Sequence, residues 1–141
     1  MKKLLPILCL LILVSCSNEV PLDQLVERNG ITYEINSQTP FTGSFVNYHE
    51  NGQLKVRRNF KDGKRDGLSE DFYENGQLNS KENYKEGELN GLREYYNEKG
   101  QLKFIQNWKD GKPDSLWEYF DEEGNLTETE EYKNGELIET D

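Results

Sequence analysis

Three scarcities in this 141-residue sequence limit what the protein can be: it has no alanine, one histidine and two cysteines. Alanine is the strongest helix former, so its absence beside 12 glycines, eight tyrosines and six phenylalanines excludes an all-helical protein. The single histidine, His49, stands next to a predicted turn, where we expect it to be exposed. One histidine, with both cysteines confined to the N-terminal segment, cannot assemble the usual nucleophile sites. We therefore expect no enzymatic activity, no metal site and no cofactor.

The one continuous apolar run covers residues 4–15 and follows Lys2 and Lys3. At about a dozen residues it is shorter than the roughly 20 that a membrane-spanning helix needs. The run ends at Ser15, a small residue directly before Cys16, and this arrangement resembles a bacterial lipoprotein signal. The resemblance implies a signal peptide at 1–15, attachment of fatty acids such as palmitate to Cys16, and a lipidated tether at 16–28. An ordinary signal peptide or a short anchor, with Cys16 incidental, is the alternative.

The residue after Cys16 and the charge balance indicate a location and a kind of partner. Ser17 stands where lipoproteins kept at the inner membrane usually carry aspartate, so we expect a membrane anchor in the outer membrane, facing the periplasm. Loss of Lys2 and Lys3 with the signal changes the net charge from −10 to −12. A surplus of negative charge of this size favours a basic protein as the partner and makes nucleic acid a poor partner.

Glycine recurs every 24 residues, at positions 52, 76, 100 and 124, and its neighbours recur with it. Each of these glycines is followed by Gln or Asn and then by Leu, and eight residues later by an aromatic residue and a lysine. Four copies at so short a period indicate a repeat architecture. The recurring aromatic residues are Phe60, Tyr84, Trp108 and Tyr132, and a second glycine follows each of them at 63, 87, 111 and 135.

The turn sequences indicate that each unit is a β-hairpin. Asn51-Gly52, Asp62-Gly63 and their equivalents are the residues preferred in tight turns, where the chain needs positive φ. Successive glycines stand 11 and then 13 residues apart, too close for a crossover helix, so the chain must run as a meander. We predict an all-β fold, one elongated antiparallel β-meander of 24-residue hairpin repeats at 29–141, with an imperfect N-terminal capping unit. The predicted strands are 31–35, 42–48, 53–60, 67–73, 77–84, 91–96, 101–108, 115–120, 125–132 and 136–140.

Alternation along the strands predicts two unlike faces. We expect the packed face to carry the leucines and aromatic residues at even positions, such as Leu54, Phe60, Leu92, Phe104 and Trp108. The opposite face then exposes an aromatic strip that could bind protein or stack on sugar rings. Cover by a second packed layer is the alternative. The strip, our candidate binding site, consists of Tyr95, Ile105, Trp117, Tyr119, Tyr73 and Phe45.

The unit at 48–67 reads Tyr-x-x-Asn-Gly-Gln-Leu-(x)5-Phe-Lys-Asp-Gly-Lys-x-x-Gly and resembles the MORN repeat. The resemblance is to the bacterial variant found in the YwqK-type antitoxin family, and it covers residues 29–137. It implies an elongated antiparallel sheet used as a scaffold or binding module, with toxin neutralisation assigned to some relatives. The export signal departs from that picture, because a partner of a cytosolic toxin would stay inside the cell.

These observations predict a non-enzymatic lipoprotein that binds a protein. An antitoxin or immunity role against a basic toxin fits both the charge and the family resemblance. The alternative is binding of a cell-envelope glycan through the aromatic strip. Glu70, Glu94 and Glu118 share one repeat position, which favours a structural ladder over a catalytic carboxylate pair. The six basic residues between 55 and 65 are expected to pair with nearby carboxylates on a solvated face.

The lipoprotein signal generates the first testable prediction. We expect Cys16→Ser to prevent lipidation and to release the chain from the envelope fraction, because the thiol that carries the fatty acid is gone. Globomycin should likewise cause the unprocessed wild-type precursor to accumulate. Membrane fractionation and electrophoretic mobility measure both effects, and a variant that still sediments with the envelope at wild-type size would show that the anchor is something else.

Overall fold

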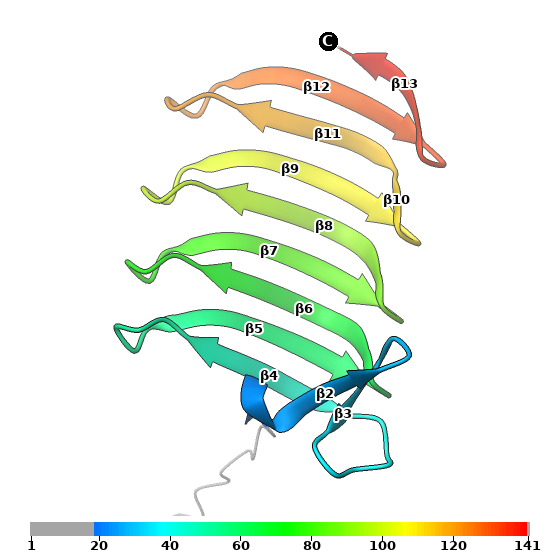
Figure 1. The fold of residues 1–141 in the computed structure, drawn as a ribbon. Helices are drawn as coiled ribbons and strands as arrows, with labels where there is room; N and C mark the ends of the chain where they lie inside the picture. Colours follow the sequence, from blue (N-terminus) through cyan, green and yellow to red (C-terminus); the bar gives the residue numbers. More distant parts are fainter. Residues whose placement is uncertain (1–18, 141) are drawn as a thin grey trace, which may run out of the picture.

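The computed structural model describes residues 19–140, so the predicted signal peptide at 1–15 and Cys16 lie outside the described residues. Consecutive hairpins stack side by side into one long sheet that runs the length of the molecule, with a short additional segment at the N-terminal end (Figure 1). The part of the chain from 19 to 140 contains no helix long and apolar enough to span a membrane. The predicted all-β meander of hairpin repeats is confirmed.

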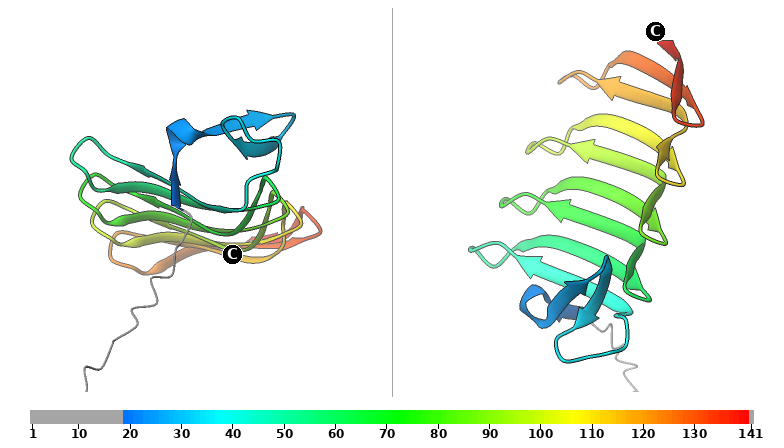
Figure 2. Two further views of the ribbon diagram at one scale, coloured as in Figure 1. Left: turned by 90° about the horizontal axis from the view of Figure 1, so that it is seen from below. Right: turned by 45° about the vertical axis from the view of Figure 1, so that its right-hand side comes forward.

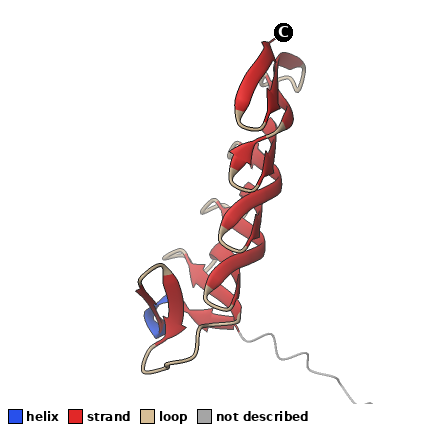
Figure 3. Ribbon diagram, turned by 90° about the vertical axis from the view of Figure 1, so that its right-hand side faces the viewer, coloured by secondary structure: helices blue, strands red, loops and turns tan. Residues whose placement is uncertain are grey.

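The long sheet has the strand order β1-β4-β5-β6-β7-β8-β9-β11-β12-β13, and β10 pairs with β9 beside this path. Neighbouring strands are antiparallel except β1, which pairs with β4 in parallel. Strands β2 and β3 form a separate two-stranded sheet that stands off the long one (Figure 3). The elements are β1 (Glu19–Pro21), the 3₁₀ turn η1 (Leu22–Gln24), β2 (Leu25–Arg28), β3 (Ile31–Glu34), β4 (Gly43–Tyr48), β5 (Leu54–Lys61), β6 (Lys64–Phe72), β7 (Leu78–Lys85), β8 (Glu88–Tyr96), β9 (Leu102–Lys109), β10 (Lys112–Pro113), β11 (Ser115–Phe120), β12 (Leu126–Lys133) and β13 (Glu136–Thr140).

All ten predicted strands are present, and their ends fall within three residues of the expected positions. Two differences lie near the N-terminus. Residues 19–28, expected as part of a tether, form β1, η1 and β2, and β3 leaves the long sheet to pair with β2. A strand of three residues such as β1 has no readable alternation, so only its pairing with β4 reveals it.

Backbone hydrogen bonds link each hairpin to its neighbour at the turns. Asp62 and its equivalents adopt φ near +50°, the conformation that a two-residue hairpin turn requires. The amide of Gly63 then donates to the carbonyl of Phe41 at 2.7 Å, and the amide of Gly87 donates to the carbonyl of Arg65 at 2.8 Å. At the opposite edge, the side-chain amide of Asn51 donates to the carbonyl of Glu74 in the next unit at 2.7 Å. The turn residues therefore fix the stacking of units as well as the hairpins themselves.

The expected division into faces is wrong, because adjacent strands pair residues of opposite sequence parity. Phe45 pairs with Arg58, and Phe104 pairs with Tyr95 on one side and Tyr119 on the other. Even positions of β5, β7 and β9 thus share a face with odd positions of β4, β6, β8 and β11. The face on which Phe104, Tyr95 and Tyr119 meet is the one that the N-terminal segment covers at its end, on the concave side of the curved sheet (Figure 2, left).

Aromatic side chains, and not leucine rows, pack this concave face. Leu92 and Leu116 remain 43% and 42% exposed, which contradicts the expected leucine core. Trp117 is 8% exposed because its ring packs in tilted contacts against Trp108, with ring centroids 5.2 Å apart, and against Tyr132, with centroids 4.5 Å apart. Rings from successive units therefore supply the burial that a single sheet without a second layer otherwise lacks.

A recurring bulge bends the strands where glycine 67 and its equivalents stand. Three residues of β6 there oppose Asn59 alone, and the side-chain amide of Asn59 donates to the carbonyl of Leu68 at 2.6 Å. Asn83 and Asn107 brace the next two units in the same way. The glycines at 67 and 91 have φ of 93° and 108°, whereas the third unit places a serine, Ser115, at φ 57°.

The presence of Ser115 where the two preceding units have glycine generates a stability prediction. A residue with a Cβ atom in the left-handed region costs about 1–2 kcal/mol, and glycine loses about 0.5–1 kcal/mol of backbone entropy in return. Ser115→Gly should therefore raise the free energy of unfolding by about 0.5–1 kcal/mol, as measured by urea denaturation.

The matched control makes the opposite kind of change at the equivalent position of the preceding unit, where a glycine is replaced by a residue with a Cβ atom. Gly91→Ala should lower the free energy of unfolding by about 1 kcal/mol or more, because the new Cβ meets Asn83 Cβ at 3.4 Å and φ is 108°. Equal effects of the two substitutions would contradict the assignment of strain to Ser115.

Candidate functional site

The concave face carries a group of four half-buried aromatic residues that we call the aromatic cluster: Tyr73, Tyr95, Phe104 and Tyr119. The rings of Tyr95 and Phe104 stack with centroids 5.1 Å apart and an interplanar angle of 11°. The rings of Phe104 and Tyr119 are tilted relative to each other, with centroids 6.2 Å apart. The Tyr73 hydroxyl donates to the carbonyl of Tyr96 at 2.8 Å and lies 3.2 Å from the Tyr95 hydroxyl. Residues of the three strands β8, β9 and β11, together with Tyr73 directly after β6, thus form one continuous aromatic surface.

A carboxylate borders the cluster on its C-terminal side. The Tyr119 hydroxyl donates to Glu130 Oε2 at 2.8 Å, and the Tyr132 hydroxyl donates to the same oxygen at 3.2 Å. Burial and the hydrogen bond to Glu130 raise the pKa of Tyr119 to about 12, so this hydroxyl stays a neutral donor at physiological pH. Among residues 19–140 no basic side chain forms an ion pair with Glu130. The negative charge at this end of the face is held by hydroxyls alone.

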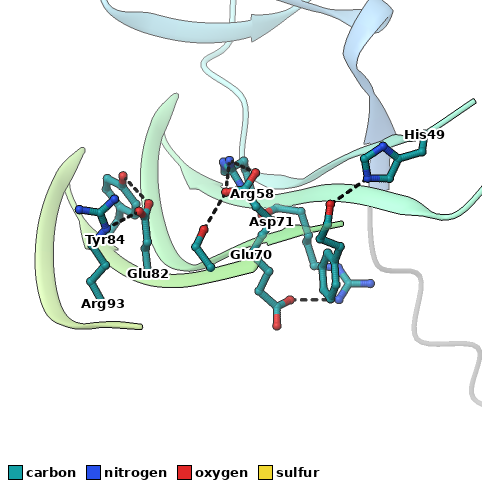
Figure 4. Close-up of polar contacts among 10 residues, drawn as sticks. His49, Arg58, Glu70, Asp71, Glu82, Tyr84 and Arg93 are labelled. Carbon is teal, nitrogen blue, oxygen red and sulfur yellow. Dashed lines mark hydrogen bonds and ion pairs between the residues drawn. The ribbon is translucent and has the colours of Figure 1, made fainter. Parts of the chain in front are cut away.

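Ion pairs occupy the N-terminal side of the same face (Figure 4). Arg58 Nη2 donates to both carboxylate oxygens of Asp71, at 2.7 and 2.8 Å. Glu82 accepts hydrogen bonds from Arg93 Nε and from the Tyr84 hydroxyl, both at 2.9 Å. Arg93 also lies over the Phe104 ring at 5.5 Å from its centroid, which ties these charges to the aromatic cluster. As expected from the sequence, part of the basic segment is paired with carboxylates.

The opposite, convex face carries the glutamate ladder that the sequence predicts. Glu70 pairs with Arg57 at 3.3 Å and Glu94 with Lys81 at 3.6 Å. Glu118 lies across from Ile105 and Thr129. The structural interpretation of the recurring glutamates is confirmed for the first two, because cross-strand cations pair with their carboxylates.

The structure brings together only part of the predicted binding strip. Tyr73, Tyr95 and Tyr119 lie in the aromatic cluster, but Trp117 is buried beneath the surface and Ile105 lies on the convex face. Phe45 shares the concave face but is 8% exposed and sits on β4, four strands from β8, which is about 19 Å. Sequence reasoning missed Phe104 and Glu130 as members of this site. Each hairpin pairs an odd-numbered residue with an even-numbered one, and this offset is the signal that would have placed both on the concave face.

His49 is not the exposed turn residue that the sequence predicts. Its Nε2 lies 2.8 Å from the carbonyl of Phe72, to which it donates, and the side chain is half-buried (Figure 4). A ring tied to the backbone in this way is positioned by the fold and faces no nucleophile in the contacts it makes. Within the described part of the chain, no three metal-ligating side chains come together.

The match to a known protein family agrees with the repeat geometry. The sequence pattern described as MORN repeat variant matches residues 41–62, 65–86, 89–110 and 113–134. No curated protein matches the sequence significantly. Among solved structures, the crystal structure of accessory secretory protein 1, 2 and 3 in Streptococcus pneumoniae is similar over 64% of this chain and 17% of that one, with 18% identity and a TM-score of 0.39. Because the four matches together span more than half of its residues, the chain belongs to the MORN repeat variant family.

Proposed function

We propose that this protein is a non-enzymatic repeat scaffold that binds another protein through its concave face, with the aromatic cluster at the centre of the contact. The observation that carries the proposal is the continuous surface of Tyr73, Tyr95, Phe104 and Tyr119, which the fold leaves half-buried without a covering layer. Rigid aromatic side chains contribute large contact areas at low entropic cost, and they dominate the energy of most protein interfaces. Family membership supports a scaffold role.

The distribution of charge supports a basic partner. All five ion pairs of the described residues lie between β1 and β8, and none involves the strands from β9 onward. Glu128 and Glu130 on the concave face of β12 therefore keep an uncompensated negative charge beside the aromatic cluster. Lysine or arginine side chains of a partner would pair with these carboxylates and steer its approach.

A toxin-neutralising or immunity role is the specific form of this proposal that the resemblance to YwqK-type antitoxins suggests. The basic toxin would then be met in the cell envelope, where Cys16 would anchor the scaffold to the outer membrane on its periplasmic side. Both statements rest on sequence motifs and on charge complementarity.

Glycan binding is the second candidate, supported by the ring faces of the same cluster. Sugar-binding sites of this kind use open tryptophan faces, whereas Trp117 packs against both Trp108 and Tyr132. Tyrosine faces remain, so the experiment must include a glycan arm.

The test compares the tagged full chain with a Tyr95→Ala/Tyr119→Ala variant as bait in cross-linked envelope extract, followed by affinity measurement with the captured protein. Loss of two aromatic anchors should weaken binding by about 2 kcal/mol or more, which corresponds to about 30-fold in Kd. Rising salt concentration should slow association more than it speeds dissociation.

Tyr48 provides the matched control, because it is 53% exposed at the end of β4 and lies outside the cluster. Tyr48→Ala should leave the Kd within about twofold of wild type. Unchanged binding by the double variant would remove the cluster as the site. Capture of soluble peptidoglycan fragments with the same aromatic dependence, and of no protein, would favour the glycan candidate.

A further inference from the structure

The N-terminal segment 19–41 forms an arch over the concave face, and both of its ends are fixed to the long sheet. At one end β1 pairs with Ser44, Phe45 and Val46 of β4. At the other end the amide of Thr32 donates to the carbonyl of Gly63 at 2.9 Å, and the carbonyl of Phe41 accepts from the amide of Gly63 at 2.7 Å. Between these attachments η1 and β2 pass above the sheet (Figure 2, left).

A groove of about 430 Å³ lies beneath the arch. This volume is within the range of pockets that hold small-molecule ligands. The arch contributes apolar side chains that remain accessible, with Leu22 55% and Val26 38% exposed. From the two sides, the apolar lining consists of Leu22, Leu25 and Val26 on the arch and Phe45, Val56 and Phe60 on the sheet.

The polar lining of the groove has a positive balance, in contrast to the chain as a whole. Asp71 neutralises Arg58 through two hydrogen bonds, which leaves Arg65 and Lys55 against the single carboxylate of Glu27. Arg65 lies over the Tyr84 ring at 5.0 Å from its centroid. Within residues 19–140 no carboxylate forms an ion pair with Arg65 or Lys55. The net positive balance of this lining occurs in a chain of net charge −10.

We propose that the groove beneath the arch binds an amphipathic carboxylic acid of small-molecule size. Its apolar body lies between the arch and the sheet, and its carboxylate pairs with the guanidinium of Arg65. A guanidinium presents two parallel N–H donors that match a carboxylate, and the Tyr84 ring behind Arg65 holds the guanidinium plane in place. This site is separate from the aromatic cluster and does not depend on the protein-binding role.

The probes are 4-phenylbutyrate and its uncharged amide, titrated into the purified full chain by isothermal calorimetry. We expect one saturable site that binds the carboxylate at least fivefold more tightly than the amide. Arg65→Gln should reduce this preference to less than twofold while the amide still binds. Arg57→Gln is the matched control, because Arg57 pairs with Glu70 on the convex face and should leave the preference intact.

A second variant acts from the arch and leaves the sheet unchanged. Val26→Glu places a negative charge in the groove at a position already 38% exposed, so folding should be preserved. This substitution should weaken the binding of 4-phenylbutyrate at least tenfold and should weaken the binding of its amide much less. Circular dichroism of each variant verifies the fold.

Three results would overturn the proposal. The first is the absence of saturable binding, and the second is an Arg65→Gln variant that keeps its preference for the carboxylate. The third is a short peptide with a C-terminal phenylalanine that binds at least tenfold more tightly than 4-phenylbutyrate and loses this affinity on amidation, which would assign the groove to a polypeptide terminus. The Tyr95→Ala/Tyr119→Ala variant should bind 4-phenylbutyrate normally, so failure of this proposal and failure of the protein-binding role are distinguishable.

Discussion

The fixed register between consecutive hairpins is the constraint on which the rest of the structure depends. Each hairpin pairs residues of opposite parity, and the 24-residue period repeats this register without drift along the sheet. The turn amides and the asparagine side chains tie every unit to the one before it, so a displaced unit would lose hydrogen bonds on both edges. A shift by one residue would move every aromatic side chain to the other face.

This register compensates for the lack of a second layer. A single sheet has no opposing layer to bury its apolar residues, and the aliphatic content outside the N-terminal run is low. Cross-strand aromatic stacks and ion pairs take that role, from Arg58 and Asp71 near the arch to Trp117 and Tyr132 near the C-terminal end. Because each stack needs the adjacent unit, stability is cooperative along the array. Other rings of the same concave face, those of Tyr95, Phe104 and Tyr119, remain half-buried and form the aromatic cluster.

The two ends of the concave face differ in shape and charge, which gives the scaffold two chemically distinct regions. The arch encloses an apolar groove with unpaired basic side chains at the N-terminal end. Toward the C-terminus the face is open, aromatic and bordered by Glu128 and Glu130. The first suits a small apolar anion, and the second suits a basic protein surface. Repeats that share one strand register therefore present different surfaces, because their sequences differ between the recurring turn positions.

The sequence by itself determined the repeat, the hairpins and the family resemblance, because turn chemistry and a fixed period are local properties of the chain. Asn-Gly and Asp-Gly pairs favour tight turns through their own chemistry, and with the 24-residue period they placed the predicted strands of the repeats. The predicted lipoprotein signal that ends at Cys16 likewise rests on neighbouring residues alone. Tertiary structure decided which residues share a face, since strand parity across a turn depends on bulges and pairing register. It therefore buried Trp117 and Phe45, turned Ile105 to the convex side and joined Phe104 to Tyr95 and Tyr119. It also decided the arch, because a three-residue strand is specified by the strand it pairs with and not by its own sequence.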